Sequence, residues 1–337
     1  MKAGILPLLL IALICGCSEK RNNDYSPENF HVIMLAEGVY ACIHKPGGRA
    51  IGNSGIVDNG EATIIFDTFL SPDAAEEMLR LVGELKLSPV KYVINSHFDN
   101  DHIRGNQVFP PDVRIISTKR TAELIAEEEP KAIAAERIYA PKQVEYYDSL
   151  ESAIKGDTSS AFYMTIKLMK PYFEELAESH IKIRTRVPDT YIFEEMRLDG
   201  SRLKVVLVDK GKGHTESDLI MYLPEEKILF AGDLLFNEAH PYLGYGYTEE
   251  LKERLAELEI MKPLIIVPGH GDPGGTEMIR SMADYIEELE RIVREIKDAG
   301  QNAEDIDNIP LPEKYRSWIV GNYFYSNLRY LFSCQGN

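Results

Sequence analysis

The chain has 337 residues, 44% of them hydrophobic, so it is long enough to bury one large core or two smaller ones. Its formal net charge of −17 at pH 7 argues against a nucleic-acid partner, because a second polyanion would be repelled. We therefore expect a globular protein with an acidic, well-solvated surface that binds no nucleic acid.

The N-terminus has the pattern of an export signal. Lys2 precedes an apolar run, Ile5 to Ile14, that is too short to span a bilayer as a mature helix. The run leads into Gly16-Cys17, which resembles a bacterial lipobox in which Cys17 would be lipidated. We expect a signal peptide at residues 1–16, a polar tether at residues 17–29 and a lipid anchor in a bacterial membrane, on its periplasmic or extracellular face. An ordinary cleaved signal peptide is the alternative, and it too would export the protein.

Short alternating apolar segments begin near residue 30 and predict the strands of an antiparallel sheet. They cover residues 31–35, 38–44, 54–57 and 62–66, with turns at Gly47-Gly48 and Asn59-Gly60. Ser71 and Pro72 suit the cap and first turn of a helix that runs to about Lys86. Further strands are expected at residues 92–95 and 113–117.

Residues 119–188 interrupt this pattern of short strands and predict a helical insertion over the core. Residues 121–129 and 132–137 have helical composition, and residues 159–180 carry apolar side chains at helical spacing. Pro171 lies inside the last of these segments and should kink or divide that helix. That the insertion covers a site as a lid is a hypothesis.

Strands and helices alternate again in the second half of the chain. Strands are expected at residues 191–193, 203–208, 219–223, 228–230 and 264–267, and helices at residues 249–261 and 276–298. The tail, residues 311–337, is rich in aromatic residues and should pack as a helix, from about Pro312 to Phe332, on a main domain of residues 30–310. This order predicts an α/β architecture in which helices flank two sheets.

The stretch from Ser96 to His102 carries the strongest chemical signal. Four side chains that can bind a metal, those of His97, Asp99, Asp101 and His102, fall within six residues directly after an apolar strand. Such crowding of imidazoles and carboxylates is costly unless a cation offsets the charge and uses the lone pairs. The alternative is a solvated polar turn, which Asp-Asn-Asp would suit.

Three later loops offer the same kind of ligand at the ends of strands. They carry His214, Asp233 and His270, each beside glycines that let the backbone approach a shared centre. Loops of this kind can together build a two-metal site, in which the ions lie about 3.5–4 Å apart.

Nearly the whole mature chain resembles the metallo-β-lactamase-fold hydrolase superfamily. The resemblance rests on the order of Asp67, the loop from His97 to His102, and His214, Asp233 and His270. The segments His240–Gly244 and Leu311–Trp318 resemble members outside the antibiotic-degrading lactamases. The resemblance implies an αββα sandwich, in which two mixed β-sheets are flanked by helices.

The resemblance also implies two divalent metals, with zinc as the first expectation. Six side chains would be divided between them: His97, Asp99 and His214 on the first metal, and Asp101, His102 and His270 on the second. Asp233 would bridge the two ions. Asp67 would bind neither and would hydrogen-bond the metal-binding loop; a simple carboxylate at the approach to a helix is the alternative.

Asp99 departs from the family's usual pattern, His-x-His-x-Asp-His, which has a histidine at this position. A carboxylate makes the first site harder and more anionic, so iron or manganese becomes an alternative to zinc. Flavodiiron proteins share the fold and also have a carboxylate there, which makes a di-iron redox enzyme an alternative function, although the sequence shows no flavodoxin-like domain. A first site left weak or empty, because Asp99 does not bind, is a further alternative.

The activity that the resemblance implies is metal-dependent hydrolysis of a small-molecule substrate. A metal-bound hydroxide would attack an ester, lactone, amide or related bond, and Asp101 would orient this nucleophile and help to move its proton. Tyr242, Tyr245 and Tyr247 could donate hydrogen bonds to the substrate or could simply pack. His240 is expected to support the loop rather than to bind a metal.

Cys42 and Cys334 are the cysteines that remain once the leader is set aside. Neither fits the cysteine with which some lactamases bind the second metal, a role that Asp233 would take here, so an antibiotic-degrading β-lactamase is only an alternative. Nothing in the spacing of Cys42 and Cys334 indicates that they pair, although export would permit a disulfide.

Overall fold

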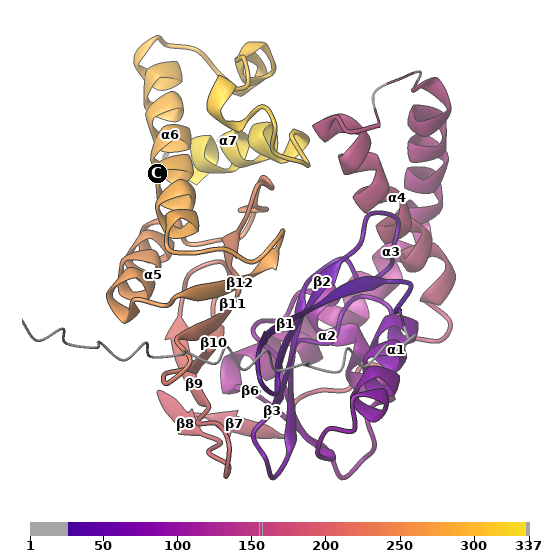
Figure 1. Cartoon of the computed structure of the whole chain (residues 1–337). Coiled ribbons are helices and arrows are strands. Elements are labelled where there is room, and N and C mark those ends of the chain that lie inside the picture. The colour runs from indigo at the N-terminus through magenta and orange to yellow at the C-terminus, as the bar shows by residue number, and fades with distance from the viewer. Residues whose placement is uncertain (1–25, 155, 157, 335–337) are drawn as a thin grey trace, which may run out of the picture.

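The computed structural model describes residues 26–334 apart from residues 155 and 157. The expected signal peptide, Cys17 and most of the expected tether lie outside these residues. The described chain folds into two mixed β-sheets flanked by helices, so the predicted α/β sandwich is confirmed (Figure 1).

The first sheet has seven strands, whose order in space is their order in the chain. They are β1 (Phe30–Ala36), β2 (Val39–His44), β3 (Ser54–Asp58), β4 (Thr63–Phe66), β5 (Val90–Ile94), β6 (Arg114–Thr118) and β7 (Thr190–Ile192). The first four pair antiparallel, as predicted, and the strands from β4 to β7 pair parallel. The carboxyl ends of β4 and β5 therefore meet at one edge of the sheet.

The second sheet has five strands in the order β12 (Ile265–His270), β11 (Ile228–Phe236), β10 (Asp218–Leu223), β9 (Val206–Gly211) and β8 (Glu195–Arg197). Only β11 and β12 pair parallel. Strand β8 was not predicted, because its three residues are an exposed, charged edge without apolar alternation. The predicted strand at residues 228–230 was too short, since β11 continues to Phe236.

Alternation along β4 shows how the layers form. Ile64 and Phe66 pack into the core between the two sheets, whereas Ile65 packs on the other face. That face is covered by α1 (Pro72–Glu84), through Met78 and its neighbours. Because both faces of the strand are buried, its residues read as a continuous apolar run.

The outer face of the second sheet is covered by α5 (Thr248–Met261) and α6 (Glu277–Asp298), and α7 (Asn322–Cys334) packs against α6 (Figure 1). Helix α6 buries one face at helical spacing, including Met282, Tyr285 and Leu289. The helix predicted from about Pro312 begins only at Asn322: a short 3-10 helix at Glu313–Tyr315 precedes it, and Ile319 forms a bridge with Ala239.

The insertion consists of two helices, α3 (Lys119–Ala153) and α4 (Ala161–Ser179). The separate helices predicted at its start are one continuous helix that passes through Pro130 and Pro141, and Pro171 does not divide α4. Packing between the helices outweighs the proline penalty: Tyr147 of α3 stacks on Phe173 of α4, with ring centroids 5.5 Å apart.

Cys42 and Cys334 are both free thiols, and Cys42 is buried in the core. Within the described part of the chain, each helix is too short or too polar to cross a membrane.

Candidate metal centre

The residues expected to bind metal converge at the edge where β5, β11 and β12 end. His97 and Asp99 lie in the loop after β5, and Asp101 and His102 lie on the short helix α2 (Asn100–Ile103). His214 lies in the turn between β9 and β10. The prediction that Asp233 and His270 follow their strands was wrong: Asp233 lies inside β11 and His270 is the last residue of β12. The pairing register of β11 shifts around Gly232, which is how the strand turns Asp233 toward the centre.

The first group of potential ligands contains His97, Asp99, His214 and Asp233, whose ligand atoms all lie within 4.8 Å of one another. His214 Nε2 lies 3.3 Å from Asp99 Oδ2, and His97 Nε2 lies 3.5 Å from the same oxygen. The structure therefore brings the atypical residue, Asp99, together with the two imidazoles of its expected group.

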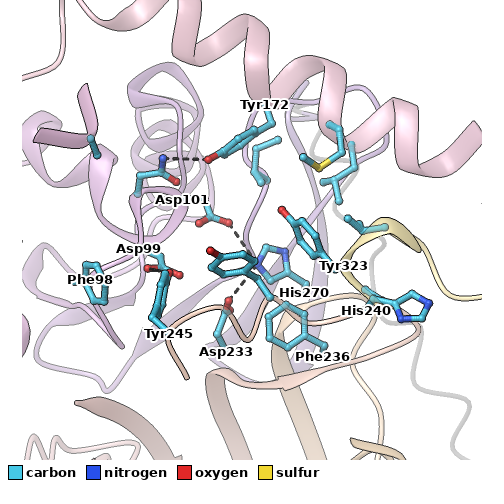
Figure 2. Close-up of a pocket in the computed structure, with 18 of the residues that line it drawn as sticks. Phe98, Asp99, Asp101, Tyr172, Asp233, Phe236, His240, Tyr245, His270 and Tyr323 are labelled. Atoms are coloured by element: carbon cyan, nitrogen blue, oxygen red, sulfur yellow. Dashed lines mark hydrogen bonds and ion pairs between the residues drawn. The ribbon is translucent and has the colours of Figure 1, made fainter. Parts of the chain in front are cut away.

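The second group contains Asp101, His102 and His270. Asp233 reaches both groups: its Oδ1 lies 3.1 Å from His102 Nε2, and its Oδ2 lies 3.4 Å from His270 Nε2 and 3.5 Å from His214 Nε2. Figure 2 shows Asp233, His270 and Asp101 turned toward one another across this space. Asp233 thus stands where a carboxylate could be shared by two ions.

Buried polar atoms without hydrogen-bond partners show that these residues fit a metal. His97 Nε2, His102 Nε2 and Asp233 Oδ1 are buried and form no hydrogen bond, despite the short distance between the last two. Unpaired polar atoms are costly inside a protein. A divalent cation among them would use these lone pairs, and imidazole and carboxylate are suitable donors for zinc, iron or manganese.

The charges of the centre shift the pKa values of its members. Burial raises the pKa of Asp99, but the neighbouring imidazoles of His214 and His97 bring it well below its usual range. Burial lowers the pKa of His214, and Asp99 and Asp233 then raise it to about 9. For Asp233 the effects of His270 and His102 likewise outweigh burial and lower its pKa. Protons and a metal cation therefore compete for the same lone pairs at neutral pH.

Asp67 holds the loop that carries these ligands. Its Oδ1 accepts a hydrogen bond from the Ser96 amide at 2.8 Å, and its Oδ2 lies 2.7 Å from Ser96 Oγ and 2.9 Å from His102 Nδ1. Asp67 has a φ of +59°, a strained conformation for a residue with a side chain. A carboxylate bonded to Nδ1 fixes His102 so that Nε2 points into the centre.

Two supporting residues were missed by sequence reasoning. Asn53 is buried and donates to the carbonyls of Pro268 and Gly271, on either side of His270. Asp218 accepts from the amide and hydroxyl of Thr215, next to His214. Asn53 lies far in sequence from the ligands, and Asp218, four residues after His214, has no partner that the sequence reveals, so only their burial as polar residues marks them.

A pocket of about 370 Å³ opens beside the centre, between α3, α4 and the tail. Its lining includes the aromatic side chains of Phe98, Tyr172, Phe236, Tyr245 and Tyr323, which Figure 2 labels, together with those of Tyr139 and Tyr242. Ile51, Leu168 and Met169 add aliphatic surface, and Glu128, Glu129 and Glu136 lie at the α3 side. None of the described residues that line the pocket is a lysine or an arginine.

The tyrosines that follow Asp233 have different surroundings. Tyr245 donates a hydrogen bond to Asp99 Oδ1, and Tyr242 lines the pocket. Tyr247 is absent from the described lining and has Lys212 over its ring, 4.3 Å from the centroid. His240 points away from the centre in Figure 2 and bonds Tyr285 and the carbonyl of Tyr315, so it joins its loop to α6 and the tail.

The insertion is tied to the metal-binding loop by a buried ionic network. Arg104, directly after α2, bonds Glu129 at 2.7 Å and Glu136 at 2.6 Å, both on α3. Asn100, between Asp99 and Asp101 in the sequence, donates to the other oxygen of Glu136 at 3.0 Å. The helices that roof the pocket therefore also fix the loop below it.

Comparisons with known proteins agree with this geometry. The family model of the metallo-beta-lactamase superfamily matches residues 47–270, which is more than half of the chain. The "Probable metallo-hydrolase YqjP" of Bacillus subtilis (strain 168) is 25% identical over 258 residues, which cover 71% of this chain and 73% of that protein. The "Beta-lactamase-like protein 2 homolog" of Caenorhabditis elegans is 30% identical over 118 residues, so this chain covers only 37% of its length.

A solved structure shows the same fold. The metallo-beta-lactamase from Pontibacter korlensis superposes with a TM-score of 0.55 at 19% identity, over 77% of this chain and 99% of that one. At this identity the likeness bears on the fold alone. The family model, the sandwich of two sheets and the cluster of histidines and aspartates lead to one conclusion: the chain belongs to the metallo-beta-lactamase superfamily.

Proposed function

We propose that the protein is a dinuclear metal-dependent hydrolase of small molecules. The observation that carries the proposal is the position of Asp233, whose two oxygens face both groups of ligands at the mouth of a pocket. In this proposal His97, Asp99 and His214 would hold the first metal, Asp101, His102 and His270 would hold the second, and Asp233 would be shared by both. Zinc is the first candidate, and the name of the relative YqjP supports a metallo-hydrolase.

The metals would supply the reactive chemistry. When bound, divalent ions would lower the pKa of a bound water to about 7 and polarise the oxygen of the bond to be cleaved. The chain's own residues would position these components: Asp67 holds the metal-binding loop, and Asn53 holds the backbone around His270.

Asp101 has the best placement to handle a proton. Its Oδ2 lies 3.3 Å from His270 Nε2, and its side chain also lines the pocket. A carboxylate at this boundary can accept a hydrogen bond from the attacking water and pass the proton toward the leaving group. We therefore assign Asp101 the orienting and proton-transfer role.

The pocket favours a substrate with an uncharged apolar or aromatic group next to an ester, lactone or amide. Burial of such a group against the aromatic and aliphatic walls of the pocket would contribute favourable free energy of binding. A carboxylate would be desolvated there without a lysine or arginine partner among the described lining residues. Since β-lactam antibiotics carry a carboxylate, β-lactam hydrolysis is the weaker candidate.

A matched set of substrates tests the proposal. The zinc-loaded protein should hydrolyse neutral 4-nitrophenyl esters or lactones, lose activity with a chelator and regain it with zinc. An Asp101→Asn variant should lose roughly 100-fold or more in kcat/KM, the size expected of a general acid–base group. Asp272→Asn is the control, because Asp272 is exposed and lies two residues beyond His270. Turnover that survives complete metal removal would contradict the proposal.

A di-iron redox enzyme is the second candidate, and the placement of Asp99 favours it. Its carboxylate faces the two imidazoles of the first group, which gives a harder donor set than three histidines. Two irons per chain with visible absorption, and no hydrolysis after zinc loading, would select this alternative.

We also propose that the protein is exported and anchored to a bacterial membrane through lipidated Cys17, which lies outside the described residues. The support is the sequence from Lys2 to Cys17. Radiolabelled palmitate should be incorporated into the full chain in a bacterial host and lost in Cys17→Ser. Cys15→Ser is the matched control and should keep the label.

A further inference from the structure

The two carboxylate oxygens of Asp99 have different partners. Oδ2 faces His214 Nε2 at 3.3 Å and His97 Nε2 at 3.5 Å. Oδ1 accepts a hydrogen bond from the hydroxyl of Tyr245, which comes from the loop between β11 and α5. One oxygen is thus directed toward the other ligands of the first group while the second is held from outside.

We propose that Tyr245 is a positioning residue that fixes Asp99 as a single-oxygen ligand of the first metal. This inference rests on the proposed function. A neutral histidine offers a metal one lone pair at a given ring nitrogen, whereas a carboxylate can rotate or bind through both oxygens. Hydrogen bonds from outside a metal site remove this freedom and set the orientation of the ligand. Tyr245 supplies such a bond where the chain has an aspartate in place of the usual histidine.

The Tyr245 ring is itself held in place. Its centroid lies 5.5 Å from that of Phe98, 5.2 Å from that of Tyr242 and 6.0 Å from that of His214. Phe98 and His214 belong to the same two loops that supply ligands of the first group. The ring therefore packs directly on the structure that it would organise.

Backbone contacts fix the loop that carries Tyr245. The Tyr247 amide donates to the carbonyl of Gly213 at 2.9 Å, directly beside His214. On the other side, buried Asn327 of α7 accepts from the Leu243 amide at 3.0 Å and donates to the carbonyl of Pro241 at 2.8 Å. The C-terminal helix thus holds the loop from which Tyr245 reaches Asp99.

Cobalt titration of the full chain tests the inference without relying on activity. Tyr245→Phe removes only the hydroxyl, and we expect one of the two bound Co²⁺ ions to bind roughly 10- to 100-fold more weakly, with altered visible absorption. Tyr242→Phe is a matched control, because Tyr242 is the same residue type, is also 37% exposed and does not bond Asp99 in the described structure. We expect its cobalt affinity to stay within about threefold of the parent.

The Asp99→His variant shows whether the Tyr245 hydroxyl acts by positioning Asp99 or by packing. In Asp99→His the ligand presents a single nitrogen, so adding Tyr245→Phe should change cobalt affinity by less than about threefold. Equal cobalt affinities of Tyr245→Phe and Tyr242→Phe, or a full loss in the Asp99→His background, would overturn the inference. If the parent binds no cobalt, both the proposed function and the inference about Tyr245 fail. Normal binding by the parent with an unchanged Tyr245→Phe would reject the role of Tyr245 alone.

Discussion

Replacing Arg104 by methionine should destabilise the protein strongly, because it leaves two buried carboxylates without their cationic partner. The Arg104 side chain is 1% exposed, and its partners Glu129 and Glu136 are 5% and 3% exposed. Removing one partner of a buried ion pair costs about 3–5 kcal/mol, since the remaining charge stays desolvated. We expect a loss of this size in the free energy of unfolding of Arg104→Met.

Urea unfolding of metal-free protein measures this loss without a contribution from bound ions. The control is Arg291→Met on α6, which removes an arginine bonded to Glu288 and Glu295 but 48% exposed. Exposed pairs contribute at most about 1 kcal/mol, so this variant should remain close to the parent. A loss below about 1 kcal/mol in Arg104→Met would refute the reasoning. Adding Glu129→Met and Glu136→Gln to Arg104→Met should recover much of the lost free energy of unfolding. No recovery would show that the cause is lost packing and not the unpaired buried charges.

Two other predictions test the loops around the centre. Gly269→Ala should abolish binding of the bridged metal pair in calorimetry with zinc, because an added Cβ would lie 1.8 Å from Asp233 Oδ1; unchanged zinc binding would contradict the geometry. Burial lowers the pKa of His240 to about 4 from 6.5, so the unfolded chain binds the proton more readily between these values. The stability that neutral His240 supports is complete above pH 6.5 and is lost as the pH falls toward 4. Between pH 7 and 5 the parent should therefore lose about 2 kcal/mol more than His240→Asn in urea unfolding, and identical pH profiles would refute the assignment.

The sandwich and the residues that meet at the centre could be predicted because their signals are local. Each ligand-bearing segment places an acid or imidazole within a few residues of an apolar strand, and in the three later segments a glycine lies beside the ligand. The predicted ends of strands and helices were wrong where contacts between distant elements determine how far an element extends. Strand β11 continues past Gly232 because it pairs with β12, and α3 continues through Pro141 because Ala140 and Tyr147, on either side of that proline, pack on α4.

The supporting network of the centre could not be predicted from the sequence. Glu129 lies 25 residues after Arg104 and Glu136 lies 32 residues after it. In the sequence, the charged residues of this part of α3 have the pattern of a solvent-exposed helix face. Tyr245 was one of three candidate tyrosines, and only the folded loop shows that it is the one that bonds Asp99. Pairings of this kind depend on how separate elements pack, which local patterns do not encode.

Metal stoichiometry tests the central claim most directly. Mass spectrometric metal analysis of the purified chain, after zinc loading and removal of excess ion, should give about two zinc ions per chain, as a two-metal site requires. Asp233 joins both groups of ligands, so Asp233→Asn should fall well below that value. A parent that holds about one zinc ion or none, or an Asp233→Asn variant that still holds about two, would contradict the account of a shared dinuclear centre.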